Sequence, residues 1–286
     1  MARRHPWWLA AAVLTGMLAG GTVAARQRRG RAMQQGILRP LGRAWTTVDG
    51  CRIHARVAPR PGTTPVVLVH GLGVSGAYFR PTAERLAVEY AVYVPDLPGH
   101  GLSDTPDQAL DVPALGAALL DWLAAMEIPR AVLVGHSLGC QTVVEAALHE
   151  PARVARLVLV GLVPDPAARD AVSLLRRFVL AAAFEHPALV PLVARDYLRM
   201  NRRFLPEYRA MLDNPIEDKL ARLAQPTMLV RGEHDALIPP EWFETAAALC
   251  GAGHTAVIPH WGHAVNYSAP GPLLRVIRPF LRETPA

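Results

Sequence analysis

The segment GHSLG, from Gly135 to Gly139, places a serine hydroxyl between two glycines. It follows an apolar run at 131–134 and precedes a stretch with helical spacing, which predicts a sharp turn between a strand and a helix. Such a turn strains the backbone of the serine, and small neighbours let the chain pass close to itself. The hydroxyl would point into solvent above a helix N-terminus, whose dipole favours developing negative charge. We therefore interpret Ser137 as the nucleophile of an acyl-transfer reaction.

A serine hydroxyl is a weak nucleophile, so this chemistry also requires a histidine base and a carboxylate that orients it. Asp235 follows an apolar run at 227–230, and His263 follows another at 255–258. The chain order of nucleophile, acid and base is the one expected when the serine lies on a strand-to-helix turn. We predict that Ser137, Asp235 and His263 form a catalytic triad.

Each role has other candidates in the sequence. Asp165 also follows a predicted strand and could supply the carboxylate instead of Asp235. Ser137 could be no more than the cap of a helix in a glycine-rich turn. Further polar residues adjoin the acid and the base, and we interpret them as loop residues or as solvated or hydrogen-bonded imidazoles. They are Glu233, His234, His254 and His260.

Acyl transfer develops an oxyanion, which requires two preorganised N–H donors. The first predicted donor is the backbone N–H of Leu138, the residue after the nucleophile. The second is the backbone N–H of Leu72, in the HGLG segment 70–73, which follows the apolar run 66–69. Its paired glycines would permit close backbone approach, although a glycine-rich turn can also be a connecting turn without a catalytic role.

Short apolar runs without polar alternation recur along the chain, as expected for strands buried on both faces of a parallel sheet. They cover residues 66–69, 91–94, 131–134, 154–160, 227–230 and 255–258. Segments with helical spacing alternate with them, at 81–88, 112–126, 138–149, 241–249 and 273–281. Before the first run, Asp49 and Gly50 lie between two strand-like segments and predict a β-hairpin. The sequence therefore predicts an α/β fold with right-handed crossovers.

The interval of about 164–224 interrupts this alternation. It contains no good strand, only helical stretches at 167–184 and 189–204. Because it lies between two strands, it would emerge at the carboxyl edge of the sheet, where open α/β folds place their ligand sites. We interpret it as a helical insertion at that edge.

Composition excludes some functional classes. With 51% hydrophobic and 19% charged residues, the 286-residue chain can bury a sizeable core. The first 31 residues hold six arginines and no acidic residue, so the net charge of +6 belongs to this tail and the body is balanced. A nucleic-acid partner is therefore not expected. The three cysteines form no zinc-type pattern, and we expect free thiols and no structural metal.

The N-terminal tail, residues 1–31, contains a 19-residue apolar stretch from Trp7 to Ala25. This length just reaches across the hydrocarbon core of a bilayer, at about 1.5 Å per residue. We predict an uncleaved membrane anchor, because the arginines at 26–29 resist translocation. A cleaved export signal and a dispensable tail stay open as alternatives, as does the side of the membrane on which the body lies.

From about residue 44 onward, the chain resembles the α/β-hydrolase family. The resemblance rests on HGLG at 70–73, DLPGHGLSD at 96–104, GHSLG at 135–139, GEHD at 232–235 and GH at 262–263. It implies a mostly parallel eight-stranded sheet over residues 43–286, a helical cap, no cofactor, and the same nucleophile, acid and base. It also implies that His100 and Asp104 belong to a structural loop. Cys140, where the family often has a smaller residue, is a departure that affects helix packing.

Within this family, a serine nucleophile excludes the epoxide hydrolases and haloalkane dehalogenases, which use aspartate. The insertion is rich in leucine, valine and phenylalanine, so we predict a small ester with an apolar acyl group as substrate. The cluster of Arg199, Arg202 and Arg203 is interpreted as a solvated surface. A C–C bond hydrolase of ring-cleavage diketo acids and a non-catalytic binding protein are the alternative functions. The oligomeric state is not predicted.

Overall fold

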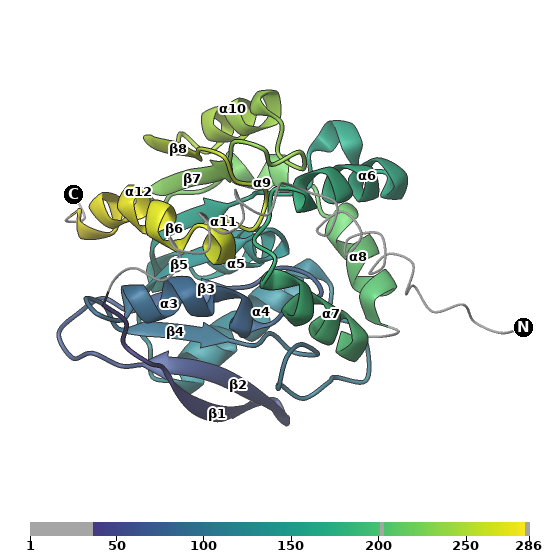
Figure 1. The fold of residues 1–286 in the computed structure, drawn as a ribbon. Coiled ribbons are helices and arrows are strands. Elements are labelled where there is room, and N and C mark those ends of the chain that lie inside the picture. The colour runs from purple at the N-terminus through teal and green to yellow at the C-terminus, as the bar shows by residue number, and fades with distance from the viewer. Residues whose placement is uncertain (1–36, 201–202, 284–286) are drawn as a thin grey trace, which may run out of the picture.

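The computed structural model describes residues 37–200 and 203–283, and its strands form one eight-stranded sheet (Figure 1). The strand order is β1-β2-β4-β3-β5-β6-β7-β8. The strands are β1 (Gly42–Val48), β2 (Cys51–Ala58), β3 (Val66–Val69), β4 (Val92–Pro95), β5 (Ala131–His136), β6 (Val154–Val160), β7 (Thr227–Gly232) and β8 (His254–Ile258). Strand β2 is antiparallel to β1 and β4, and the other neighbouring pairs are parallel. The predicted α/β fold is confirmed.

The sheet begins with the hairpin of β1 and β2. Asp49 and Gly50 both have positive φ, at 47° and 76°. This combination is typical of a two-residue turn whose twist matches that of the flanking strands. The turn sets the register that pairs Val48 with Cys51.

Two apolar layers enclose the sheet because successive side chains of a strand point to opposite faces. In β3, Val66 and Leu68 pack in one buried cluster, and Val67 and Val69 pack in the other. The first cluster includes side chains of α3 (Arg80–Leu86), α11 (Val265–Ser268) and α12 (Pro270–Arg282). The second includes α4 (Val112–Ala125), α5 (Leu138–His149) and α10 (Pro240–Leu249). Burial on both faces explains the uninterrupted apolar runs of β3 to β7. The prediction was wrong for β8, which lies at the edge of the sheet and is largely exposed.

In the described part of the interval between β6 and β7, a short 3-10 turn is followed by four α-helices. They are α6 (Ala171–Ala182), α7 (Leu189–Met200), α8 (Phe204–Leu212) and α9 (Ile216–Leu220). The first begins later than the pattern from residue 167 predicts, because the Asp170 side chain accepts hydrogen bonds from the backbone N–H groups of Val172 and Ser173 and caps the helix there. Figure 1 shows α6, α7 and α8 beyond one end of the sheet, away from α12.

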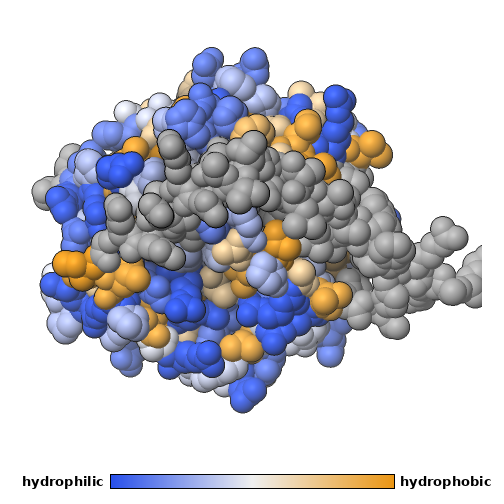
Figure 2. Space-filling model, viewed as in Figure 1, coloured by the Kyte–Doolittle hydropathy of each residue, from blue (hydrophilic) through white to orange (hydrophobic). Residues whose placement is uncertain are grey.

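The face shown in Figure 2 carries small hydrophobic patches among hydrophilic residues. No helix within the described residues is long and apolar enough to cross a membrane. The predicted anchor at residues 7–25 lies outside the described residues.

Candidate active site

Ser137 occupies the turn that joins β5 to α5. Its backbone has φ 56° and ψ −122°, a strained combination for a residue with a side chain. The turn is held because the Ser137 N–H donates to the carbonyl of Val160 and the Cys140 N–H donates to the carbonyl of Ser137. The sharp strand-to-helix turn expected from GHSLG is therefore present.

The glycines of the motif are required by close packing. A Cβ on Gly135 would lie 2.4 Å from the carbonyl oxygen of Gly139, and a Cβ on Gly139 would lie 2.2 Å from that of Val69. Both distances are far below van der Waals contact, so any larger residue would displace the turn. These glycines allow α5 to begin directly against the end of the sheet.

Asp235 and His263 meet at the carboxyl ends of β7 and β8. His263 Nδ1 lies 2.8 Å from Asp235 Oδ2, and the Leu237 N–H donates to Asp235 Oδ1. Since a carboxylate can only accept, the geometry assigns the proton to His263 Nδ1. Both side chains are almost fully buried.

The environment of His263 favours its protonated form. Burial lowers the pKa of His263, but the charge of Asp235, its hydrogen bond and the charge of Glu185 together hold that pKa above its usual value. The buried Nε2 atom has no hydrogen-bond partner among the described residues. Ser137 and His263 line the same cavity. The imidazole thus has one nitrogen fixed by a carboxylate and the other available for proton transfer.

The other acid and imidazole candidates have different partners. The Asp165 carboxylate is 2.6 Å from a guanidinium nitrogen of Arg177 and caps a short helical turn at Ala167. His254 contacts Glu283 at 3.1 Å, on the edge strand β8. Glu233, His234 and His260 form a separate surface cluster. Among the described residues, Asp235 hydrogen-bonds to the His263 ring, and none of these other side chains does.

The segment after β3 passes directly against the serine. A Cβ on Gly71 would lie 2.9 Å from Ser137 Cβ and 3.2 Å from the carbonyl oxygen of His136, so glycine is needed for this approach. Leu72 lines the cavity together with Ser137. Leu138 is the first residue of α5, where backbone N–H groups have no partner within the helix. The two residues expected to supply oxyanion donors therefore flank the Ser137 turn.

His136, the second residue of GHSLG, has a role that the sequence analysis missed. Its Nε2 donates to the carbonyl oxygen of His263 at 3.0 Å, and the two rings are 4.6 Å apart between centroids. Burial first, and then the nearby charge of His263, hold the pKa of His136 well below its usual value, so this ring is neutral. His136 thus ties the loop of His263 to the serine turn. The sequence signal that could have identified His136 is its position directly before Ser137 in GHSLG.

Glu185, between α6 and α7, was also missed. Its Oε1 accepts from the backbone N–H of Ala264 at 2.7 Å, and its Oε2 accepts from the Ser268 hydroxyl at 2.6 Å. Burial raises the pKa of Glu185 to about 7, despite these hydrogen bonds and the charge of His263. This carboxyl group fastens the inserted helices to the residues that follow His263. No local motif marks it, because its partners are about 80 residues away in sequence.

A cavity of about 910 Å³, including its open mouth, connects these groups. Its wall is largely apolar and comes in good part from α6, α7 and α8. The apolar wall residues include Val74, Phe178, Leu189, Val193, Phe204 and Met211. The polar residues of the wall include His136, Ser137, Glu185 and His263. The arrangement places the Ser137 hydroxyl and the His263 imidazole beside a largely apolar ligand space.

The loop 96–104 is held by buried polar contacts on both the sheet and the inserted helices. Asp96 accepts hydrogen bonds from the backbone of Gly76 and Leu102 and contacts His54 Nδ1 at 2.9 Å. Burial opposes ionisation of Asp96, yet the contacts with His54 and nearby positive charges lower its pKa to about 2. In the same loop, His100 Nε2 lies 3.3 Å from Glu207 of α8. The loop therefore joins the sheet to the inserted helices.

The basic residues predicted to form a solvated surface differ in their contacts. Arg203 donates to Glu207 and to the carbonyl oxygens of Pro106 and Gln108, so its guanidinium is held by the protein. Arg199 is exposed, and Arg202 lies outside the described residues. Cys51, Cys140 and Cys250 are free thiols, and buried Cys140 directs its Sγ to the carbonyls of Gly135 and Val160.

The sequence profile of the alpha/beta hydrolase family matches residues 66–276, which contain Ser137, Asp235, His263 and the inserted helices. The chain belongs to this family. It is therefore a hydrolase, and its relatives include the pimeloyl-(acyl-carrier protein) methyl ester esterase of Stenotrophomonas maltophilia. The two sequences are 30% identical over 227 residues, which cover 70% of this alpha/beta hydrolase and 85% of the relative. The corresponding esterase of Xanthomonas campestris pv. campestris is also 30% identical, over 232 residues.

Solved structures agree with this alpha/beta hydrolase assignment. A thermophilic esterase from Thermogutta terrifontis superposes with a TM-score of 0.70 at 25% identity, covering 84% of this chain and 98% of the esterase. A bacterial membrane phospholipase A superposes with a TM-score of 0.75 at 20% identity, over 97% of this chain and 94% of that protein. The second likeness concerns the fold alone.

Proposed function

We propose that this hydrolase cleaves carboxylic esters with apolar acyl groups through an acyl-enzyme. The observation that carries the proposal is the shared cavity of Ser137 and His263, with Asp235 bonded to the far side of the imidazole. A hydroxyl on a strained turn, a base and an orienting acid are the three groups that this chemistry requires.

In the first half-reaction, Ser137 Oγ attacks the ester carbonyl carbon while His263 Nε2 removes the hydroxyl proton. Asp235 keeps the imidazole oriented and stabilises its positive charge. The N–H groups of Leu72 and Leu138 bind the oxygen that becomes negatively charged, because each donor stabilises the transition state more than the ester. His263 then protonates the leaving alcohol as the carbon–oxygen bond breaks, leaving the acyl group on Ser137.

In the second half-reaction, water replaces the alcohol. His263 removes a proton from the water as its oxygen attacks the acyl carbon, and the same two N–H groups again bind the oxyanion. The proton on His263 returns to Ser137 Oγ as the acid leaves. Each proton that His263 accepts is given back, so the enzyme ends in its starting state.

The cavity wall supports an apolar acyl group. The wall of the cavity is mainly aliphatic and aromatic, which suits a hydrocarbon acyl chain. Among the described residues that line it, none is a lysine or arginine. A dianionic diketo acid would therefore find no cationic partner there, and this favours ester cleavage over the C–C hydrolase alternative. The methyl ester esterases among the relatives agree with an ester substrate.

The test is a panel of p-nitrophenyl esters of increasing acyl length, together with the Ser137→Ala variant. We expect kcat/KM to rise from acetyl to medium-chain esters, because each buried methylene favours binding by about 0.8 kcal/mol. Ser137→Ala should lose about 10⁴-fold or more of kcat with the fold retained. Ser173→Ala, a serine on α6 outside the cavity wall, is the control. A fluorophosphonate probe should label wild type and Ser173→Ala but not Ser137→Ala. Near-wild-type turnover by Ser137→Ala would overturn the proposal.

We further propose that the helices within 164–224 act as a cap over this site and that residues 7–25 anchor the chain to a membrane. The cap proposal is supported by the wall residues from α6, α7 and α8. The anchor proposal rests on the apolar sequence alone. Fractionation of cells that express the chain with or without residues 1–31 tests the anchor. Equal partition of the two forms into the soluble fraction would contradict it.

A further inference from the structure

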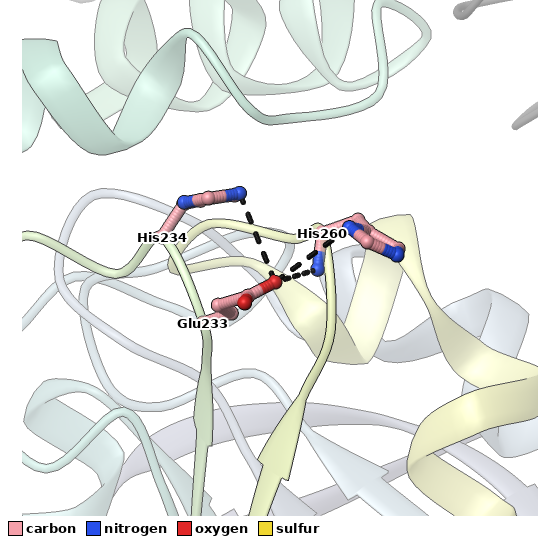
Figure 3. A group of neighbouring side chains, drawn as sticks. All are labelled: Glu233, His234 and His260. Carbon is pink, nitrogen blue, oxygen red and sulfur yellow. Dashed lines mark hydrogen bonds and ion pairs between the residues drawn. The ribbon is translucent and has the colours of Figure 1, made fainter.

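Glu233, His234 and His260 bring their side chains together on the surface beside β7 and β8 (Figure 3). One ligand atom from each residue lies within 4.8 Å of the other two. Glu233 Oε2 is 3.8 Å from His234 Nε2 and 3.6 Å from His260 Nδ1. None of the three lines the cavity of Ser137. They form a distinct cluster that the ester chemistry does not use.

Two imidazoles and one carboxylate are a common ligand set for zinc and similar ions. Bonds of about 2.0–2.1 Å to a tetrahedral ion place neighbouring ligand atoms about 3.3 Å apart. The two distances to Glu233 exceed this spacing by only a few tenths of an ångström, which side-chain rotation can remove. Figure 3 shows the Glu233 carboxylate between the two rings, with His234 Nε2 and His260 Nδ1 toward it. The donor atoms are therefore already near the positions that an ion requires.

The backbone holds these ligands in place. The Glu233 N–H donates to the carbonyl of Ile258, and the His234 N–H donates to the carbonyl of Trp261, each at 2.9 Å. These bonds join the segment after β7 to the segment after β8. The His260 backbone N–H also donates to Glu233 Oε2, which holds this oxygen between the two imidazoles.

The His234 ring has a further support. It stacks on Phe184 with a centroid separation of 4.1 Å and an interplanar angle of 26°. The contact fixes the ring plane and links the cluster to the segment that follows α6. Solvent can reach the site, because the His260 side chain is 79% exposed and that of Glu233 is 46% exposed. An ion could thus enter without any rearrangement of the fold.

We propose that Glu233, His234 and His260 bind one divalent transition-metal ion of the zinc class, with water completing its coordination. Such an ion bridges the segment that leads to Asp235 and the segment that leads to His263. Because it binds the folded arrangement and not the separated loops, it stabilises the native chain. The proposal does not depend on the ester chemistry at Ser137.

Three variants test the ligands in the full-length chain after treatment with a chelator. They are Glu233→Gln, His234→Ala and His260→Asn. Asparagine is chosen at position 260 because the backbone there has φ 68°, which asparagine tolerates. His254→Asn is the matched control, because His254 also pairs with an exposed carboxylate, that of Glu283 at 3.1 Å, but belongs to no three-ligand group among the described residues.

Titration calorimetry with zinc chloride should give one ion per wild-type and His254→Asn chain. Affinity should fall at least about tenfold in each of the three ligand variants. Magnesium, which prefers oxygen ligands, should give no comparable binding. The thermal transition of wild type should rise with zinc, and that of His260→Asn should rise much less. Absence of zinc binding to the wild-type chain, or wild-type affinity in all three ligand variants, would overturn the proposal.

A second measurement avoids substitutions altogether. Diethyl pyrocarbonate modifies unprotonated, accessible imidazoles, and mass spectrometry locates the products. In the wild-type chain, zinc should slow modification of His234 and His260 while leaving that of His254 unchanged. Equal rates with and without zinc at the first two positions would contradict the site even if a variant failed to fold.

Discussion

His263 Nδ1 lies 2.8 Å from Asp235 Oδ2, although 28 residues separate the two in sequence. The contact joins the ends of two adjacent parallel strands, β7 and β8. It determines the tautomer of the imidazole, because the carboxylate can only accept a hydrogen bond. The nitrogen without a partner among the described residues is therefore the one that can receive a proton.

Replacement of Asp235 by asparagine should lower kcat for ester hydrolysis by about 10⁴-fold while the fold is retained. The amide can donate to His263 Nδ1, which stabilises the wrong tautomer and removes the charge that supports the imidazolium. Steady-state kinetics and circular dichroism check this result. Asp165→Asn is the matched control, because Asp165 pairs with Arg177 and should be dispensable for the chemistry. If Asp165→Asn lost kcat to this extent and Asp235→Asn did not, Asp165 and not Asp235 would be the acid.

The activity of the wild-type enzyme should rise with pH through the pKa of His263. The pKa of this group is raised above 6.5, and only the neutral imidazole can accept the proton of Ser137. Asp235→Asn should move this limb of the kcat/KM profile to lower pH, because the largest favourable interaction with the imidazolium is lost. By linkage, the pairing of protonated His263 with Asp235 contributes its full stabilisation to the fold below about pH 6.5. This contribution is lost as pH rises through the pKa of His263 in the folded protein. An acid limb that did not move in the variant would contradict the assignment.

Glu185→Gln should change the pH dependence of stability. Because burial raises the pKa of Glu185 from 4.5 to about 7, the wild-type fold loses stability as pH rises between those values. This loss is on the order of 3 kcal/mol, and glutamine, which does not ionise, should remove it. Its oxygen can still accept from Ala264 and its amide can donate to Ser268. Thermal unfolding from pH 5 to pH 8 measures the difference, and parallel curves for the two proteins would refute the expectation.

Gly161→Ala should damage the site more than the fold. Gly161 has φ 62°, and a Cβ there would lie 2.8 Å from Cε1 and 3.0 Å from Nδ1 of His263. The imidazole would have to move, so kcat should fall at least about tenfold for a shift on the order of 1 Å. Gly251→Ala is the control, because φ is 55° and a Cβ would meet nothing within 4 Å. Both variants should lose about 1–2 kcal/mol of stability from backbone strain, but only the first should lose activity. Equal kinetics for the two would mean that His263 tolerates the contact.

Much of the fold could be predicted from local pattern. The apolar runs identify the buried strands, because a strand covered on both faces lacks alternating polar residues and is therefore continuously apolar in sequence. Asp49 and Gly50 identify the hairpin, because few residues accept positive φ at both turn positions. The start of α6 could not be placed by apolar spacing alone, because the cap formed by the Asp170 side chain makes the helix begin at Ala171, four residues after the pattern does.

The sequence by itself determined the strand-to-helix turn at Ser137, because the glycines on either side are the only residues that its close packing admits. Only the tertiary structure decided that Asp235, rather than Asp165, contacts His263, since both carboxylates follow buried strands. The contacts of His136, of Glu185 and of the surface cluster around Glu233 and His260 were likewise decided only by the tertiary structure. Their partners come from distant segments that the sheet brings to one edge, and no local spacing in a chain encodes which of them meet.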